Sequence, residues 1–348
     1  MTTKVFIHAA NVHQGGGRSL LDALLKSFNG AVILLVDERM HLPVDMSKNI
    51  HVKRVKPSIV QRLLAERWLA ENVASEDVVL CFGNLPPLFK LHGYTEVFLQ
   101  NRYLIENVSL SGFSFKVHLR LVVERLWLSW MMKNVDAFIV QTPTMKRLLE
   151  SKMQLKVPVR VFPFVADPNG YVRDLTQLKV RKDIVFDFVY VASGEPHKNH
   201  RRLIEAWCLL AEEGVFPSLT LTLSEDRFTG LCRDIDELRQ RHKLQVKNVG
   251  ELFHKDVFAL YKNAGAAIYP STFESFGLPL IEARQAGLPI LASELDYVRD
   301  VINPEHTFDP ESVVSIARAV MRFMGKDEVP LPLLDACRFM ASVVERAE

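Results

Sequence analysis

The chain has 348 residues, of which 48% are apolar, 24% charged and 9% aromatic, with a formal net charge of +2. This composition is too apolar for a disordered chain, and the length favours two domains over one. No run of about 18 uncharged apolar residues is present, so no transmembrane helix is expected. The four cysteines form no CxxC pair, so we expect neither a disulfide framework nor a metal site, and a cytoplasmic location fits.

The small net charge conceals an uneven distribution. Residues 1–165 contain 21 Lys and Arg against 13 Asp and Glu, whereas residues 166–348 contain 22 against 28. The basic first half either meets an anionic partner, such as a bilayer surface, or is an ordinary solvated surface. Its basic residues form no recognisable nucleic-acid-binding module, so nucleic acid is not an expected partner.

Short apolar runs alternate with helical patterns along the chain, which predicts βαβ units with parallel strands. The expected strands form two series. The first comprises residues 4–10, 31–36, 51–55, 77–82, 96–100, 136–140 and 157–162. The second comprises residues 186–191, 219–223, 245–249, 266–270 and 288–292.

Two series of strands predict two Rossmann-like, doubly wound α/β domains that face each other across a cleft. The expected parts are a first domain (1–165), a connector (166–182), a second domain (183–330) and a C-terminal helix (331–348). One possibility for the C-terminal helix is that it packs back against the first domain. The connector is predicted because its surroundings contain prolines and a glycine and lack helical periodicity.

The most specific segment is PSTFESFGLPLIEARQAGLPILAS (270–293), which follows an expected strand. Pro279 suits the first turn of a helix, because its missing N–H would be unpaired there. A helix is therefore predicted to begin near Leu278, leaving the N–H groups of Phe276, Gly277 and Leu278 free to face an anion. A pyrophosphate group fits such a helix end.

Two carboxylates, Glu274 and Glu282, lie eight residues apart in this segment. The break at Gly277 and Pro279 places Glu274 in the loop and Glu282 on the first turn of the helix. One carboxylate then lies beyond the phosphates, and the other can accept protons from two vicinal hydroxyls of a nucleoside. The alternative is structural, with Ser271 and Glu274 as a capping box and Glu282 as a favourable charge near a helix start.

This segment resembles the E-x7-E signature of the retaining glycosyltransferases of family 4, which have the GT-B fold. Other segments resemble the same family in the expected order, over nearly the whole chain. They are GGGRSLL (15–21), VQTPTMKRLL (140–149), VRVFPFVAD (159–167), HKNHRRLIEAW (197–207) and FDP (308–310). Val165 is a departure, because the family's connector usually has glycine there.

The resemblance implies a metal-independent transfer of a hexosyl group from a nucleoside diphosphate sugar to an acceptor hydroxyl, with retention of configuration and without a cofactor. It implies that Glu282 holds the ribose and Glu274 orients the sugar. The leaving diphosphate helps to deprotonate the incoming hydroxyl, so no strong protein base is needed. None of the 11 histidines is a convincing general base.

Lys198 lies at the entry of a helix that follows an expected strand. Its ammonium can neutralise the charge that develops on a leaving diphosphate, although exposed lysines are also common at helix starts. In the family an arginine commonly precedes this lysine by five residues, where this chain has Ser193. Arg201 or Arg202 can compensate, or both can be surface residues.

Gly15, Gly16 and Gly17 follow the first strand and precede a helical pattern, so their N–H groups can approach an anion closely. A plain turn is the alternative. The resemblance places Gly15 and Gly16 beside the donor phosphates and the acceptor, where Arg18 adds charge.

Three amides of the first domain, Asn84, Gln100 and Asn101, follow expected strands. Each can donate to and accept from sugar hydroxyls, or can serve a turn at the edge of the sheet. Many family members have a histidine near Gln100 that contacts the transferred sugar.

The stretch KVHLRLVVERLWLSWMMKN (116–134) combines apolar, basic and tryptophan residues at helical spacing. Packing into the core is the favoured interpretation, and docking in a bilayer interface is the alternative.

We therefore predict a glycosyltransferase of surface polysaccharide biosynthesis, O-antigen lipopolysaccharide or capsule, with a lipid-linked or oligosaccharide acceptor. It is expected in the cytoplasm or peripherally on the cytoplasmic face of the inner membrane. The alternatives are a non-catalytic homologue that binds a nucleotide or a partner, and an epimerase or hydrolase of sugar nucleotides on the same fold.

Overall fold

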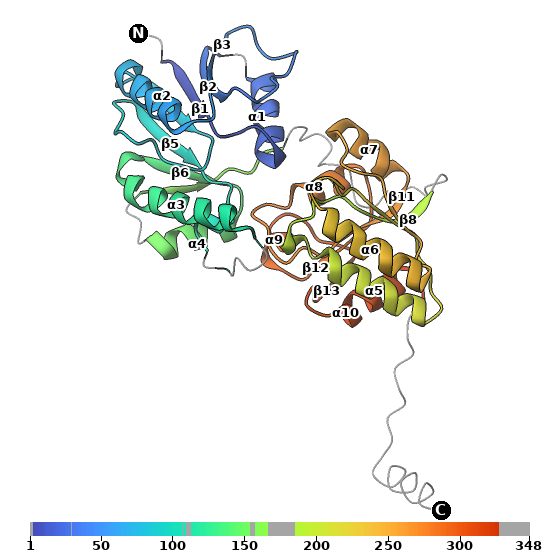
Figure 1. Ribbon diagram of the computed structural model, residues 1–348. Helices are drawn as coiled ribbons and strands as arrows, with labels where there is room; N and C mark the ends of the chain where they lie inside the picture. Colours follow the sequence, from blue (N-terminus) through green and yellow to red (C-terminus); the bar gives the residue numbers. More distant parts are fainter. Residues whose placement is uncertain are drawn as a thin grey trace, which may run out of the picture.

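The computed structural model contains two α/β domains that lie side by side (Figure 1). It describes residues 3–28, 30–106, 108, 113–153, 157–165 and 185–326. In both domains the strands pair in parallel, as alternation with helices predicts. The expected connector and the expected C-terminal helix lie outside the described residues.

The first domain has a seven-stranded sheet in the order β3-β2-β1-β4-β5-β6-β7. Its strands are β1 (Val5–Ala9), β2 (Val32–Asp37), β3 (Ile50–Val55), β4 (Val78–Cys81), β5 (Tyr94–Phe98), β6 (Ala137–Val140) and β7 (Val159–Val161). The chain builds outward from β1 to β3 and then returns to the other side of β1. Ligands of such sheets bind where the order reverses, here between β1 and β4.

Helices cover both faces of this sheet. They are α1 (Gly15–Ser27), α2 (Ile59–Asn72), α3 (Phe115–Met131) and α4 (Pro143–Met153), with the 3₁₀ turns η1 (Arg102–Leu104) and η2 (Met132–Asn134). Leu34 and Val36 of β2 share a core with α1, whereas Leu35 shares a core with α2, α3 and α4. The alternation follows from the two-residue period of a strand.

The second domain has a six-stranded sheet in the order β10-β9-β8-β11-β12-β13, which reverses between β8 and β11. Its strands are β8 (Phe186–Tyr190), β9 (Leu219–Leu221), β10 (Val246–Asn248), β11 (Ala264–Tyr269), β12 (Ile290–Ser293) and β13 (His306–Phe308). Its helices are η4 (Pro196–Lys198), α5 (His200–Glu212), α6 (Thr229–His242), α7 (His254–Lys262), α8 (Leu278–Gln285), α9 (Asp296–Arg299) and α10 (Val313–Phe323).

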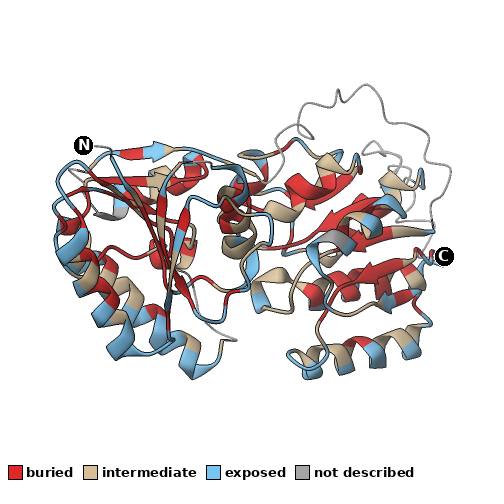
Figure 2. Cartoon of the chain, turned by 90° about the horizontal axis from the view of Figure 1, so that it is seen from above, coloured by how far each residue is buried: buried red, intermediate tan, exposed pale blue. Residues whose placement is uncertain are grey.

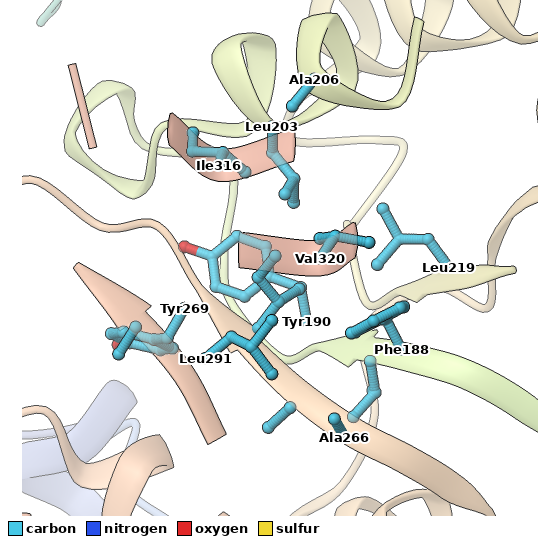
Figure 3. Packing of buried hydrophobic residues seen from close by; sticks show 14 of the residues in the cluster. Phe188, Tyr190, Leu203, Ala206, Leu219, Ala266, Tyr269, Leu291, Ile316 and Val320 are labelled. Atoms are coloured by element: carbon cyan, nitrogen blue, oxygen red, sulfur yellow. The ribbon is translucent and has the colours of Figure 1, made fainter. Parts of the chain in front are cut away.

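Each domain has its own core. In Figure 3, Phe188 and Tyr190 of β8 pack with Leu203 of α5 and Val320 of α10, and all four are fully buried. Figure 2 shows buried residues concentrated in the strands, with exposed residues on the outer helix faces. Burial of one such large apolar side chain contributes about 1.5–3 kcal/mol to folding.

All twelve predicted strands are confirmed, with ends shifted by a few residues. The sequence missed β13, which has only three residues and no alternating pattern. Gly15–Gly17 were expected before the first helix, but they form its first turn.

Candidate functional site

The loops that follow β8 and β11 meet at the reversal point of the second sheet. The backbone carbonyl of His197, in η4, accepts hydrogen bonds from the Ser271 hydroxyl (3.0 Å) and the Thr272 N–H (2.8 Å). The Tyr190 hydroxyl donates to the carbonyl of Lys198 at 2.7 Å. These bonds fix η4 against the loop after β11 and thereby position the side chain of Lys198.

Lys198 and Glu274 form an ion pair at this point. The Lys198 Nζ lies 2.5 Å from the Glu274 Oε1, which also accepts from the hydroxyls of Ser271 (2.8 Å) and Tyr269 (3.0 Å). Both side chains of the pair are largely buried, at 14% and 13% exposure. Burial alone would raise the pKa of Glu274, but the Lys198 ammonium reverses this and lowers it, so the carboxylate is charged at neutral pH.

The start of α8 lies beside this pair. Gly277 is its N-cap and has a φ of +71°, a left-handed conformation that favours glycine, and Pro279 occupies the first turn. Among the described residues, no acceptor bonds the N–H groups of Phe276, Gly277 and Leu278. The predicted helix start is confirmed, and it offers three N–H donors to an anion.

The capping-box alternative is wrong. Ser271 does not cap a helix, because α8 begins only after Gly277, and its hydroxyl donates to Glu274 instead. Glu274 lies in the loop, as predicted. Glu282 is the fifth residue of α8 and thus lies beyond the predicted first turn. It is buried, and its Oε1 accepts from the His254 Nε2 at 2.9 Å. This hydrogen bond raises the pKa of His254.

A pocket of about 230 Å³ lies between β8, the loops after β9 and β10, and α8. Its polar lining comes from Ser193, Lys198, Thr222, Ser224, Arg227 and Glu251. The Arg227 side chain is 48% exposed, and its nearest carboxylates, Glu195 and Glu251, lie 3.6 and 3.8 Å away. The pocket therefore offers two cations, of which Lys198 is tightly paired and Arg227 loosely paired.

The glycine turn of the first domain, Gly15–Gly17 at the start of α1, faces the start of α8. A Cβ atom added to Gly16 would lie 4.0 Å from the Leu278 side chain, and one added to Gly17 would lie 3.6 Å from the Gln100 side chain. Arg102 of η1 also reaches the second domain, because its guanidinium bonds the Glu274 carbonyl at 3.2 Å. The described site is thus lined from both domains.

Residues 178–333 match the model of the family described as "Glycosyl transferases group 1". The match spans less than half of the chain, which is similar to that family over these residues. The O-antigen chain mannosyltransferase B of Escherichia coli is 28% identical over 143 residues, which are 40% of this chain and 37% of the relative. A glycogen synthase of Mycobacterium tuberculosis (strain H37Rv) is 36% identical over 110 residues, which are 30% of this chain and 26% of that protein. The chain thus covers well under half of the length of both relatives.

A solved structure supports the fold over nearly the whole chain. HepE from Anabaena, crystallised with UDP-glucose, has a TM-score of 0.67 and 15% identity, and the match covers 93% of this chain and 90% of HepE. The GT-B fold that the sequence predicts is confirmed, with two parallel-sheet domains.

The predicted compensation for Ser193 is not located on α5. Arg202 pairs with Glu311 at 2.8 Å and Arg201 with Asp234 at 2.5 Å, and neither lines the pocket that contains Lys198. Ser193 itself lines the pocket, and its hydroxyl bonds Glu195. The additional cation in the pocket is Arg227, which the sequence analysis did not select.

The three predicted amides mainly serve the backbone. The Asn84 Oδ1 accepts from the N–H groups of Gln100 (2.6 Å) and Asn101 (2.9 Å), which fixes the turn after β5. The Asn101 side chain caps η1 through the Tyr103 N–H at 3.1 Å. Gln100 faces the glycine turn and donates to a carbonyl of the first domain. The predicted Arg18 lies on α1, where Asp22 is 3.6 Å away.

Two residues of this site were not predicted: Arg227 comes from the loop after β9, and His254 is the first residue of α7, which follows β10. Their position after the carboxyl end of a strand was the only signal available in the sequence. In the part of the chain that the structure describes, no group of three His, Cys, Asp or Glu side chains is placed to hold a metal ion. No described helix has the length and hydropathy needed to cross a membrane.

Proposed function

We propose that the chain transfers a hexosyl group from a nucleoside diphosphate sugar to an acceptor hydroxyl, with retention of configuration and without a metal ion. The observation that supports this proposal most is the Lys198–Glu274 ion pair beside the unpaired N–H groups at the start of α8. One ammonium and a helix N-terminus together suit a diphosphate, and the carboxylate suits sugar hydroxyls.

In this proposal the bond between the sugar C1 and the diphosphate oxygen breaks, while the acceptor oxygen bonds C1 on the same face. The proton of the acceptor hydroxyl passes to the leaving diphosphate. Lys198 and the N–H groups of residues 276–278 stabilise the charge that develops on the diphosphate. Glu282 accepts from the ribose hydroxyls, and Glu274 orients the sugar.

The proposed acceptor is a lipid-linked or oligosaccharide chain of a surface polysaccharide. Its support is the similarity to an O-antigen chain mannosyltransferase, together with the basic first half of the chain. The proposed location is the cytoplasm or the cytoplasmic face of the inner membrane, where nucleoside diphosphate sugars meet lipid carriers.

The test begins with thermal unfolding in the presence of UDP, GDP, ADP and dTDP. A ligand at about 100 times its dissociation constant adds roughly 2.7 kcal/mol to the free energy of unfolding, so the cognate base is identified by the largest shift. With that donor we expect Lys198→Ala to lower kcat by about 10²-fold or more, and Glu282→Ala mainly to raise KM. Lys247→Ala, an exposed lysine on β10, is the control.

Wild-type kinetics in both site variants would show that the assigned residues are wrong. Product from the donor alone would indicate a hydrolase or an epimerase. Nucleotide binding without turnover over a broad set of acceptors would indicate a non-catalytic homologue.

A further inference from the structure

Helix α3 carries a continuous apolar stripe that is exposed to solvent. Only Leu121 and Leu128 of its 17 residues are buried. The exposed apolar residues are Phe115 (80%), Leu119 (52%), Val122 (37%), Val123 (51%), Leu126 (46%) and Trp130 (67%). Their spacing of three and four residues places them on one side of the helix. The favoured prediction, that this stretch packs into the core, is wrong for this face.

The neighbouring helix α2 is exposed in a similar way at its beginning. Its exposed apolar residues are Ile59 (89%), Val60 (66%), Leu63 (49%) and Leu64 (53%). The two helices approach each other on the first domain, since the Arg62 guanidinium of α2 lies 5.3 Å from the Trp127 ring of α3. So many large apolar side chains on adjacent helices are unusual for a surface that meets only water.

The charges around the stripe are basic. Lys116, Arg120 and Lys133 are exposed on or directly after α3. The acid of this helix, Glu124, is only 23% exposed and lies 3.8 Å from Arg120, and burial raises its pKa. An apolar face with cationic neighbours is complementary to an anionic bilayer, in which acyl chains meet phosphate head groups.

The shape of the face also fits a bilayer. The stripe extends along one convex helix for about 22 Å, from Phe115 to Trp130. Aromatic residues are placed at both of its ends, and such residues favour the boundary between head groups and acyl chains. A helix of this kind lies in the plane of the interface.

We propose that the α3 stripe, Phe115 to Trp130, docks the protein on an anionic lipid bilayer. This deepens the proposed function and rests on it only for the consequence that follows. A second pocket, of about 270 Å³, is lined by Tyr103, Phe113, His197 and Phe273 from both domains. Phe113 lies two residues before α3, so docking places this pocket beside the bilayer, where an acceptor on a lipid carrier enters.

The test measures binding to vesicles by co-sedimentation. We use phosphatidylcholine alone and phosphatidylcholine mixed with phosphatidylglycerol. Wild type is expected to bind the anionic vesicles roughly tenfold more tightly, and Lys116→Glu with Arg120→Glu is expected to remove that preference. Leu119→Glu with Leu126→Glu is expected to weaken binding to anionic vesicles by about tenfold or more.

The matched control is Phe216→Glu with Val314→Glu, because these residues are 45% and 47% exposed on the second domain. It is expected to bind like wild type. The proposal is overturned if wild type binds neither vesicle, if the control loses binding equally, or if light scattering shows a dimer that the α3 variants dissociate.

The nucleotide assay separates this proposal from the proposed function. Leu119→Glu with Leu126→Glu is expected to keep the wild-type thermal shift with the cognate nucleoside diphosphate and the wild-type kcat on a water-soluble acceptor. If no nucleoside diphosphate stabilises wild type, the proposed function fails whatever the vesicles show. If the thermal shift is normal and the vesicles are not bound, only the docking proposal fails.

Discussion

Arg227 supplies the loosely paired cation of the pocket that also contains Lys198. Its guanidinium lies 3.6 Å or more from the carboxylates of Glu195 and Glu251, so it can turn towards a diphosphate without losing a tight pair. We expect Arg227→Ala to weaken binding of the cognate nucleoside diphosphate by about tenfold, a modest effect because the side chain is half exposed. Binding of the free nucleoside should not change.

Calorimetry with the diphosphate and with the nucleoside measures this difference. Arg233→Ala is the control, because Arg233 is 73% exposed and lies 3.9 Å from each of two acids, Asp234 and Glu237. If Arg227→Ala lost as much affinity for the nucleoside as for the diphosphate, Arg227 would not be a phosphate-binding residue.

His254 is expected to make donor affinity depend on pH. Its pKa is raised above 6.5 because its Nε2 bonds Glu282, the carboxylate proposed for the ribose. Donor binding takes Glu282 away from His254 and thus favours release of its proton. Affinity should therefore fall as pH decreases through the raised pKa, and the fall should be smaller in His254→Phe. A pH titration of the dissociation constant measures it, and identical profiles would contradict the role of Glu282.

At the scale of residues, the sequence predicted Glu274 and Lys198 because a strand, a loop and a helix start occur there in an interpretable order. It did not predict Arg227 or His254. An arginine in a polar loop or a histidine at a helix start has no fixed spacing from the motif. Only the convergence of the loops after β8, β9, β10 and β11 brings these side chains together.

Glu66 of helix α2 forms a buried hydrogen bond with His8 of strand β1. It is fully buried, and its Oε1 accepts from the His8 Nε2 (2.9 Å) and the Arg62 Nε (2.8 Å). Burial alone would raise its pKa, but His8 and Arg62 hold the pKa at about 2. We expect Glu66→Ala to cost about 3 kcal/mol of the free energy of unfolding, because buried partners remain unpaired.

The same helix offers a matched control. Glu71 lies 2.8 Å from Arg67 with the same four-residue spacing, but both are exposed, so Glu71→Ala should change stability by about 0.5 kcal/mol or less. Urea unfolding measures both variants. Similar losses of stability in both variants would mean that the burial of Glu66 does not explain the effect of Glu66→Ala.

Glu66 and His8 make the free energy of unfolding depend on pH in the same direction. The carboxylate of Glu66 stabilises the fold above its ordinary pKa of 4.5, and this contribution is lost as pH falls towards about 2. Burial lowers the pKa of His8, so the unfolded chain binds a proton below 6.5 that the folded chain does not. Both groups therefore make wild type less stable as pH falls.

At the scale of elements, period-two and period-3.6 patterns predicted the strands and most helix positions. They could not separate a buried helix face from an exposed one on α3. Its apolar residues occur around most of the helix, so the pattern fits a core or a surface equally well. The sheet covers only the side of Leu121 and Leu128, and the tertiary arrangement alone shows which side remains exposed.

At the scale of the whole molecule, two domains and a cleft follow from the order of strands, whereas the contacts between the domains do not. Arg102 of η1 is buried at this boundary. Its backbone N–H donates to the Ser275 hydroxyl at 3.2 Å, and its guanidinium lies 3.3 Å from the Asp296 carboxylate. These partners are more than 170 residues away in the chain, so no local pattern encodes them.

Arg102 is expected to hold the two domains close together. Arg102→Ala should increase the radius of gyration without a nucleotide, because the guanidinium contacts with the Glu274 carbonyl and the Asp296 carboxylate are lost. It should also lower kcat, because an open cleft admits water and misplaces the two substrates. Small-angle scattering and steady-state kinetics measure the two effects. Arg160→Ala, which breaks a 2.9 Å bond to Glu96 inside the first domain, should change neither. An unchanged radius of gyration with an unchanged kcat would mean that contacts elsewhere, such as the Thr144 N–H bond to Asp300 at 3.1 Å, are sufficient to keep the domains together.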